Sequence, residues 1–460
     1  MAVYYVDQTT GDDANSGLTE ALAWKTLNKL YISAFVPDDF ILLKRGETWR
    51  EKLRNDSSGT SGHQITYGAY GSGAKPKILG SKDLSGAGSW ADEGSNIWVT
   101  AAVVVVDADV GNIIFNSEAS VGVKRATLVA CVNQGDFYYN SSTTYLRMYS
   151  VGNPGTFYTA IEAIVRDRGF DTRTLDYITV QNLDIRYCGL YGILASNGVG
   201  IIVEDNDISF IGGYYAAAPT RAGNGIEFWS SGSDSIVRRN RVSECYDAGL
   251  TFQGTAGTVV AQNQTWVYNQ VWNCEYGFEY FEFGDGAVVD GITIAHNVFY
   301  GSGYGWGHAQ HPSARGDGIA FQGMDYGAAT NCKLGNNIVA HSLEAHFYMW
   351  YTTDLAGWTV DHNVYYDGPA SPFEQRLAGP TYYTFTEWQA TYAADAHSFV
   401  ADPKYLNVAT HDFRLRQDSP CRDRGVVVSG IGQIEGGGQP DIGCDEIISG
   451  AARRKHGYRR

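Results

Sequence analysis

The sequence predicts an all-β protein that winds into a solenoid, a parallel β-helix in which equivalent strands of successive coils pair with one another. Two observations predict this fold. An Asn recurs along residues 180–363, and a short strand with alternating apolar side chains follows it on most of these repeats. The composition agrees, because 55 Gly, 31 Tyr and 11 Trp beside only 4 Met are typical of strands joined by tight turns.

The Asn repeat consists of an apolar residue followed three positions later by Asn, and its first copy is one residue shorter. The seven copies place Asn at positions Asn182, Asn206, Asn240, Asn269, Asn297, Asn337 and Asn363. Successive copies are 24 to 40 residues apart, which suits one coil with loops in the longer intervals. Side-chain amides repeated once per coil can bond along a ladder and satisfy polar groups at an inward bend. We therefore predict such a ladder.

The strands that follow the Asn residues have a period of two, so alternate side chains face the core and the outside. The residues predicted to face the core are Ile226, Phe228, Leu250, Phe252, Phe278, Tyr280, Ile319 and Phe321. The residues between them are predicted to form one column on the outer surface: Leu194, Glu227, Thr251, Glu279, Ala320 and Tyr348.

Two cysteines, Cys245 and Cys274, each lie five residues after a repeat Asn and therefore occupy the same place on adjacent coils. A stack of small core side chains is favoured over a disulfide, because a free Cys packs well as a small hydrophobic residue. The chain has 7 Cys and none forms a CxxC pair, so the sequence does not indicate a zinc site.

The ends of the chain depart from the repeat. Residues 1–84 are predicted to form an N-terminal cap and the first coils, with an amphipathic helix at 22–30 covering the open end of the solenoid. Residues 85–168 indicate an antiparallel excursion from an early coil. Residues 169–370 are predicted to hold the central coils and a groove, and 371–460 the last coils, a cap and a basic, solvated tail.

Charge limits the partners of the protein. Lys and Arg number 34 against 50 Asp and Glu, and the net charge of −16 makes nucleic acid an unfavourable partner. No run approaches the roughly 18 apolar residues of a membrane span. Residues 1–15 carry no signal-peptide pattern, which indicates either a removed leader or release by another route such as phage lysis. We expect an extracellular or virion-associated protein.

Motifs at both ends make the match more specific. The start contains Asp7, Gly11, Asp12, Asn15 and Gly17 before AWKTL, and the end contains DP at 402, FRL at 413, SP at 419 and DIG at 441. Together with the Asn coils, these motifs resemble secreted right-handed parallel β-helix proteins of the pectin-lyase-like superfamily across nearly the whole chain. The resemblance implies the fold and a polysaccharide as substrate. Residues diagnostic of pectate lyases and the DPHE stretch of mannuronan epimerases are absent from the sequence.

Two insertions predict where a substrate binds. Residues 216–228 (AAAPTRAGNGIEF) and 308–321 (HAQHPSARGDGIAF) share Pro, then Ser or Thr, then Gly and Asn or Asp. Because both leave the same corner on coils separated by two others, they are expected to wall a cleft whose floor carries Thr251 and Glu279. Three coil steps of ~4.8 Å give roughly 14 Å, enough for a few sugar units.

Carboxylates beside aromatic rings in this cleft suit glycosidic cleavage, which uses one acid and one base or nucleophile. The predicted catalytic residues are Glu279, Glu227, Asp317 and His308. The predicted substrate-binding residues are Trp229, Asp247, Tyr276, Glu282, Trp306, Gln310, His311 and Arg315. Glu279, flanked by apolar residues, is assigned as the general acid and Glu227 as the base. Their backbones, two coils apart, should lie roughly 9.6 Å apart, which favours inversion.

Hydrolysis of a polysaccharide is the preferred function, and two alternatives stay open. A lyase acting on a uronate polymer needs a base and a cation, which His308, His311 or Arg315 could provide. A glycan-binding tailspike or adhesin would bind without cleaving. No cofactor is required, although Asp12, Asp13 and Asn15 could ligate Ca²⁺; capping turns use the same residue types.

Overall fold

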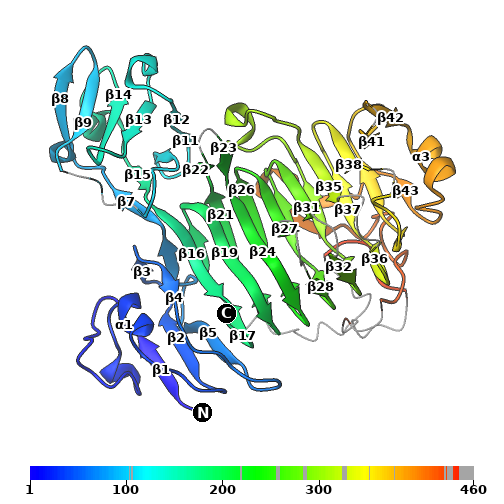
Figure 1. Ribbon diagram of the computed structural model, residues 1–460, viewed down its shortest axis with the longest axis horizontal. Helices are drawn as coiled ribbons and strands as arrows, with labels where there is room; N and C mark the ends of the chain where they lie inside the picture. Colours follow the sequence, from blue (N-terminus) through cyan, green and yellow to red (C-terminus); the bar gives the residue numbers. More distant parts are fainter. Residues whose placement is uncertain are drawn as a thin grey trace.

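The computed structural model describes residues 1–102, 104, 107–217, 220–254, 260–282, 287–323, 329–351, 353–377, 379–428, 431 and 439–444, apart from the side chains of Arg173, Ala216, Ala217, Ser231 and Glu282. The described strands wind into a parallel β-helix with three long sheets, A, B and C (Figure 1). Central coils supply one strand to each sheet in that order. The predicted fold class is confirmed.

The three sheets are defined by their strands in spatial order. Sheet A contains β1 (Val3–Val6), β2 (Phe40–Lys44), β5 (Ile65–Tyr70), β17 (Ile178–Gln181), β20 (Ile202–Glu204), β25 (Ile236–Arg238), β29 (Thr265–Val267), β33 (Thr293–Ala295), β36 (Cys332–Gly335) and β39 (Trp358–Asp361). Sheet B contains β3 (Thr48–Trp49), β6 (Lys77–Leu79), β18 (Asp184–Arg186), β21 (Asp207–Ile211), β26 (Arg241–Cys245), β30 (Gln270–Trp272), β34 (Val298–Tyr300), β37 (Ile338–Ala340), β40 (Val364–Tyr366) and β43 (Phe399–Val400).

Sheet C is the longest and carries the candidate site. It contains β4 (Leu53–Arg54), β16 (Arg166–Arg173), β19 (Cys188–Val199), β24 (Asn224–Ser233), β27 (Ala248–Gln253), β31 (Tyr276–Glu282), β35 (Asp317–Gly323), β38 (Ala345–Met349), β41 (Phe373–Gln375) and β42 (Thr381–Tyr383). Strands β28 (Val260–Gln262) and β32 (Val288–Asp290) extend its edge beyond β24. A small antiparallel hairpin, β22 (Tyr214–Ala217) with β23 (Thr220–Ala222), precedes β24.

The core runs along the axis of the solenoid. The predicted inward side chains all belong to one cluster and are buried, for example Phe228 beneath Trp266 with ring centroids 5.0 Å apart. Such burial stabilises the coils by roughly 1.5–3 kcal/mol for each large apolar side chain. Cys245 and Cys274 are buried, free thiols, as the prediction of a small-residue stack requires.

An amide ladder fills the bend between sheets A and B. Asn206 Nδ2 donates to Asn240 Oδ1 at 3.1 Å, and the same contact continues through the later repeats at Asn269, Asn297, Asn337 and Asn363. Each amide also donates to a backbone carbonyl, as Asn240 does to Val203 O at 2.9 Å. The ladder satisfies buried backbone groups at the bend, and this prediction is confirmed.

Asn182 does not belong to the ladder, and the prediction for this residue is wrong. The pairing of Asp184 with Asp207 aligns Leu183, not Asn182, with Asn206, and Leu183 N donates to Asn206 Oδ1. Asn182 instead has a φ of 59°. It thus occupies the left-handed position just before the ladder, where Asn is well tolerated. The shorter first copy of the repeat reflects this shift.

The N-terminal cap contains less helix than predicted. A short 3₁₀ turn, η1 (Glu20–Leu22), precedes helix α1 (Leu27–Tyr31), whose N-cap Thr26 accepts from Lys29 N. The helix does not begin at 22 because Trp24 bridges Val6 and its backbone bonds to Tyr5 at the edge of sheet A. Leu27 and Leu30 are fully buried in the main core, so α1 covers the open end as expected.

The antiparallel excursion forms two small sheets beside the first coils (Figure 1, cyan). Its strands are β7 (Ser81–Asp83), β8 (Trp90–Gly94), β9 (Ile97–Thr100), β10 (Ile113–Phe115), β11 (Ser120–Val121), β12 (Val123–Lys124), β13 (Asp136–Asn140), β14 (Tyr145–Tyr149) and β15 (Ile161–Ile164). Short helical turns, η2 (Ala87–Ser89), η3 (Leu128–Ala130) and α2 (Pro154–Phe157), connect them. The excursion has its own apolar core, and β16 then returns the chain to sheet C.

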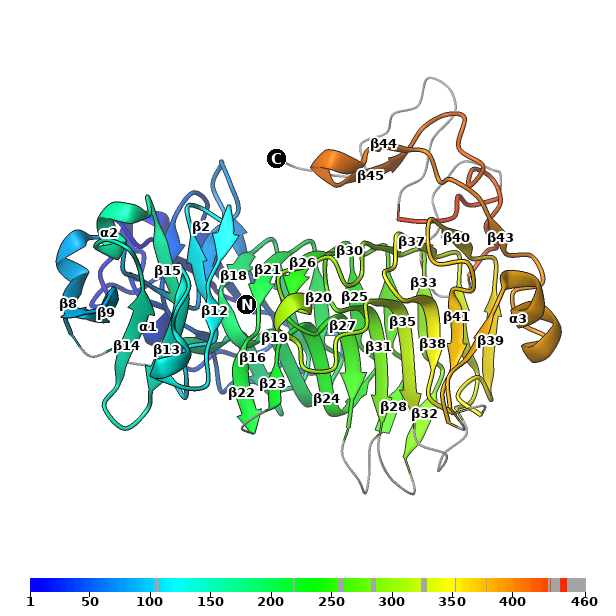
Figure 2. The same ribbon diagram turned by 90° about the horizontal axis from the view of Figure 1, so that it is seen from above.

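The C-terminal segments close the other end and one side. Helix α3 (Phe385–Tyr392) begins with a capping box of Thr384 and Glu387 and buries Trp388 against the last coil. The hairpin of β44 (Tyr405–Asn407) and β45 (Asp412–Leu415), joined by η5 (Val408–Thr410), folds back over sheet B (Figure 2). The basic residues at 453–460 lie outside the described part of the chain.

Candidate active site

The predicted outward column exists on sheet C. Strand register pairs its members in order: Leu194, Glu227, Thr251, Glu279, Ala320 and Tyr348. The same register adds Asp171 before this column and Glu374 after it. The parallel pairing therefore places several carboxylates in one line across the sheet.

The column is not an open surface, which corrects the expectation from alternation alone. Residue Glu227 is 1% exposed, Glu279 is 4% exposed, and Thr251 is fully buried. Amide side chains from neighbouring positions bond to these carboxylates and help to cover them: Asn224 bonds to Glu227, and Gln253 bonds to Glu279. Thr251 and Glu279 therefore do not line an open groove.

Glu227 is the most chemically distinctive of these carboxyls. Its Oε2 accepts a hydrogen bond of 2.5 Å from Asn224 Nδ2, while its buried Oε1 has no hydrogen-bond partner. Burial raises the pKa of Glu227 to about 8, opposed by the Asn224 hydrogen bond and assisted by the charge of Asp247. Glu227 is thus a neutral acid near neutral pH, with one oxygen uncommitted.

Glu279 is held differently. Its Oε2 accepts from Gln253 Nε2 at 2.8 Å, and its Oε1 accepts from Gln322 Nε2 at 2.9 Å. Burial, with the charges of Asp247 and Glu227, raises its pKa well above the ordinary value for Glu. Both oxygens are therefore engaged, and this carboxyl is more constrained than Glu227.

A third group of carboxylates lies where the chain enters β27 and β31. Half-buried Asp247 has its pKa raised to about 6 by burial and by Glu275, while His311 opposes the shift. Glu275 is buried, and its Oε2 bonds to Nδ1 of His308 at 2.9 Å. The ring of His311 lies 5.1 Å from that of Tyr246. This arrangement brings predicted residues Asp247, His308 and His311 together.

Asp317 and Arg315 form a closed ion-pair network instead. Arg315 Nε donates to Asp317 Oδ2 at 2.7 Å, and its Nη2 donates to Glu374 Oε2 at 2.5 Å. The guanidinium also lies over the ring of Tyr348, 3.9 Å from its centroid. Burial raises the pKa of Asp317 to about 7, although Arg315 lowers it. Arg315 is thus committed to protein carboxylates.

The two insertions lie on the same side but touch each other. Loop residue Gln310, in the turn η4 (His308–Gln310), accepts from Arg221 Nη1 at 3.1 Å through its Oε1. Its Nε2 donates to Gly122 O of the excursion at 2.9 Å. The second insertion therefore contacts the first instead of forming a separate wall, because Gln310 bonds to Arg221 of the first insertion as well as to the excursion.

The remaining predicted residues occupy varied positions. Tyr276 is nearly buried, and Trp306 donates its indole N–H to Glu244 O at 2.8 Å. The side chain of Glu282 lies outside the described part of the structure. In the N-terminal turn, Asp13 accepts from the backbone of Lys25 and Thr26, a capping arrangement. The Ca²⁺ site that includes Asp13 stays a prediction.

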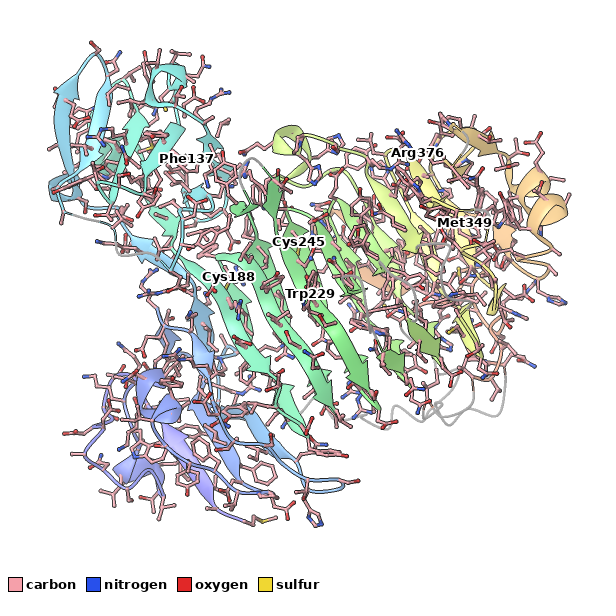
Figure 3. All side chains as sticks on the ribbon, in the orientation of Figure 1. Phe137, Cys188, Trp229, Cys245, Met349 and Arg376 are labelled. Atoms are coloured by element: carbon pink, nitrogen blue, oxygen red, sulfur yellow. The ribbon has the colours of Figure 1, made fainter. Side chains whose placement is uncertain are left out.

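A pocket opens on sheet C next to Glu227, over β16, β19 and β24. Its cavity volume is 460 Å³, and the residues that line it are Arg168, Asp171, Thr174, Tyr191, Leu194, Ser196 and Trp229. Figure 3 shows Trp229 on this broad face of the central sheet. Leu194 and Trp229 flank Glu227, one as its register partner and one two residues further along β24.

The sequence identified Trp229 but missed Arg168, Asp171 and Tyr191. Extending the outward column from Leu194 to the preceding coil would have identified Asp171. However, the pairing of β16 with β19 shifts register between Arg166 and Arg168 and between Asp171 and Arg173, so the spacing of the repeat does not hold there. In the pocket wall Arg168 Nη1 donates to Asp171 Oδ2 at 2.5 Å. The wall thus combines one cation, one carboxylate and two aromatic rings.

Comparisons with known proteins agree with this architecture. Residues 156–339 match the family model for the right handed beta helix region. Pectate lyase Pel9A has a similar structure, with 15% identity, a TM-score of 0.54 and coverage of 97% of this chain and 96% of that chain. A solved glycoside hydrolase has 8% identity, a TM-score of 0.51 and coverage of 81% and 94%. The chain is therefore a right-handed parallel β-helix protein.

One curated protein is similar in sequence. A segment of this chain is 34% identical over 89 residues to a lacto-N-biosidase from Bifidobacterium longum subsp. longum. The match covers 18% of this chain and 6% of that protein. Within the described residues, no helix is long and apolar enough to cross a membrane.

Proposed function

We propose that this protein is a carbohydrate-active enzyme that cleaves a polysaccharide or oligosaccharide on the outer face of sheet C by glycoside hydrolysis. The observation that carries the proposal is Glu227, a buried carboxylic acid with an uncommitted oxygen beside a pocket walled by Tyr191 and Trp229. The similarity of one segment to a lacto-N-biosidase supports a sugar substrate. The fold itself hosts several chemistries and does not choose among them.

Glu227 fits the role of the general acid better than Glu279. A general acid must hold a proton at working pH and release it to the glycosidic oxygen. The pKa of Glu227, raised to about 8 by burial, keeps it protonated near neutral pH. Asn224 bonds to Oε2, which leaves Oε1 as the oxygen that can carry the proton. This reverses the roles that sequence context suggested for Glu227 and Glu279.

The second carboxylate of the reaction is Asp247 or Glu279. Asp247, with a pKa of about 6 caused mainly by burial, is largely ionised at neutral pH and can act as a base. It is half-buried, whereas both oxygens of Glu279 already accept hydrogen bonds. Asp247 is therefore our first choice, with Glu279 retained as the alternative.

Bound sugar would lie in the pocket against Trp229 and Tyr191. Aromatic side chains offer an apolar body for contact and a polar tip for hydrogen bonding. A pocket volume of 460 Å³ lies within the usual range of ~300–1,000 Å³ for small-molecule sites. The substrate is then one or a few sugar units of a longer chain that continues along the sheet.

A lyase acting on a uronate polymer is the second candidate, and Arg168 favours it. This guanidinium lies in the pocket wall and is a suitable partner for a sugar carboxylate. Its contact with Asp171 weakens the case, because the cation is already partly neutralised. We therefore rank lyase activity below hydrolysis.

A polysaccharide panel tests the proposal. Purified protein is incubated with neutral and uronate polymers, and products are read as reducing ends and as ultraviolet absorbance of unsaturated sugars. Reducing ends without absorbance support hydrolysis, and absorbance supports the lyase. Retention of intact glycan without product would overturn the enzymatic proposal and indicate a binding protein. For the test variant Glu227→Gln, the matched control is Glu374→Gln. Glu374 is also a buried member of the outward column, but it lies at the far end of that column from Glu227.

A further inference from the structure

A second cluster of chemically active side chains lies near the C-terminal end of the solenoid, away from the pocket. Asp361 ends β39 and His362 follows it, while His397 lies in the segment between α3 and β43. One ligand atom from each of the three side chains lies within 4.8 Å of the other two. Segments 35 residues apart in sequence therefore bring two imidazoles to one carboxylate.

The Asp361 carboxylate is fixed by its backbone contacts. Its Oδ1 accepts from the backbone N–H of His362 at 2.8 Å and of His397 at 2.7 Å. Its Oδ2 consequently faces the two imidazoles, with Nδ1 of His397 at 2.6 Å and Nδ1 of His362 at 3.4 Å. The two rings are stacked with centroids 4.9 Å apart. Outer partners of this kind orient metal ligands in proteins.

We propose that Asp361, His362 and His397 bind one divalent transition-metal ion of the zinc type. Imidazole nitrogen and carboxylate oxygen are zinc ligands at about 2.0–2.2 Å, and water can complete a tetrahedron. Ligand atoms of such a tetrahedron lie about 3.4 Å apart, the separation already present between His362 Nδ1 and Asp361 Oδ2. Side-chain exposures of 21%, 23% and 69% for Asp361, His362 and His397 leave the ion a path of entry.

The ion would link the segment between α3 and β43 to the last coil. His397 lies between Asp395 and Ser398, two residues that terminate the amide ladder. Asn363 Nδ2 donates to Asp395 Oδ1 at 3.1 Å, and Asn363 N donates to Ser398 Oγ at 2.7 Å. An ion that binds the folded chain and not the unfolded one raises its stability. The proposed site is therefore structural and independent of the proposed catalysis.

A similar pair provides an internal control. His341 Nδ1 lies 2.7 Å from Asp367 Oδ2, just after the ends of β37 and β40, with both side chains partly exposed. Among the described residues this pair is not part of a group of three potential ligands. His341→Ala should therefore leave metal binding unchanged.

The experiment uses the full chain, stripped with a chelator and titrated with Zn²⁺ alone by calorimetry and with Co²⁺ by visible absorption. We expect one ion per chain, cobalt bands without a thiolate charge-transfer band, and a higher Tm with Zn²⁺. The variant His362→Asn keeps a residue suited to the φ of 59° at this position. Together with His397→Ala, it should weaken binding about tenfold or more.

Three results would overturn the proposal. They are the absence of saturable Zn²⁺ binding by the parent, unchanged affinity in the double variant, and a thiolate band that indicates ligation by cysteine. Far-ultraviolet circular dichroism of the double variant distinguishes a lost ligand from a lost fold. If the double variant is misfolded, His397→Ala alone decides, because His397 is largely exposed.

Discussion

Asn240 donates its side-chain amide to Asn269 Oδ1 at 3.1 Å, and Asn269 Oδ1 also accepts the backbone N–H of Asn240 at 3.0 Å. One side-chain oxygen thus satisfies two buried donors of the preceding coil. The same relationship recurs between later repeats, so the buried donors at the bend of one coil are satisfied by the Asn of the next coil.

Asn269→Ala should destabilise the solenoid strongly. The substitution leaves the backbone N–H of Asn240 without its acceptor, Asn269 Oδ1, and leaves Val237 O without its donor, Asn269 Nδ2. The side-chain amide of Asn240 also loses one of its acceptors. Each unsatisfied buried polar group costs about 1–3 kcal/mol, so a loss of about 3 kcal/mol or more is expected in chemical denaturation. Asn182→Gly is the control, because Asn182 lies outside the ladder at a positive φ and should change stability by less than about 1 kcal/mol. Equal losses in both variants would contradict the ladder assignment.

Gly249→Ala should disturb the packing of β27 against the core. A Cβ at this position would lie 2.2 Å from Val271 Cγ1 and 3.2 Å from Cys274 Sγ. Overpacking of this kind costs about 1–3 kcal/mol. At Gly88 an added Cβ meets nothing within 4 Å, so Gly88→Ala should be nearly neutral. Thermal unfolding of both variants measures the difference, and matching Tm values would speak against the close packing.

Glu227→Gln should remove a pH dependence of stability. Burial raises the pKa of Glu227 to about 8, whereas Glu in an unfolded chain titrates near about 4.3. Between these values the folded chain retains a proton that the unfolded chain has lost. The stability that depends on this proton is fully present below the unfolded value and is lost as pH rises through about 8, by at most about 1.4 kcal/mol per pH unit.

The difference between the free energies of unfolding of Glu227→Gln and of the parent should therefore shift in favour of the variant as pH rises from about 5 to about 8. Burial also raises the pKa of Asp247 to about 6 and that of Asp317 to about 7. Both carboxyls are present in variant and parent, so their contributions to the pH dependence of stability largely cancel in the comparison. Parallel stability curves for variant and parent would mean that Glu227 is ionised in the folded chain.

Trp229→Ala should weaken binding of the oligosaccharide product or substrate found in the panel. Loss of an aromatic contact worth about 0.5–1.5 kcal/mol corresponds to a weakening of up to about tenfold. Trp350 is 39% exposed and does not line the pocket, so Trp350→Ala should bind as the parent does. Isothermal titration separates the two, and equal affinities would exclude the pocket as the sugar site.

Periodic features could be predicted from the sequence. Alternation identified the core partners Ile226 and Phe228, and a once-per-coil Asn identified the ladder, because both signals repeat with the geometry of the fold. The prediction for Asn182 failed because the shorter first copy shows that a residue is missing but does not show which residue takes the ladder position. The strand register shows that Leu183, not Asn182, aligns with Asn206. The prediction of a helix at 22–30 failed because Trp24 makes tertiary backbone contacts that override the local amphipathic pattern.

The candidate site could be predicted only in part. Glu227 and Glu279 were identified in one column, but their burial depends on Asn224, Gln253 and Gln322, whose side-chain directions the pattern does not specify. The contact of Arg221 with Gln310 joins distant loops and has no periodic signal. The same is true of the approach of His397 to Asp361.

Turnover of Glu227→Gln on the polymer that the parent cleaves tests the central proposal most directly. With Glu227 as the general acid, kcat/KM should fall by about 10²- to 10⁴-fold, while Glu374→Gln retains near-parent activity. Asp247→Asn and Glu279→Gln, measured beside it, show which carboxylate completes the pair. Near-parent turnover of a folded Glu227→Gln variant would contradict the account.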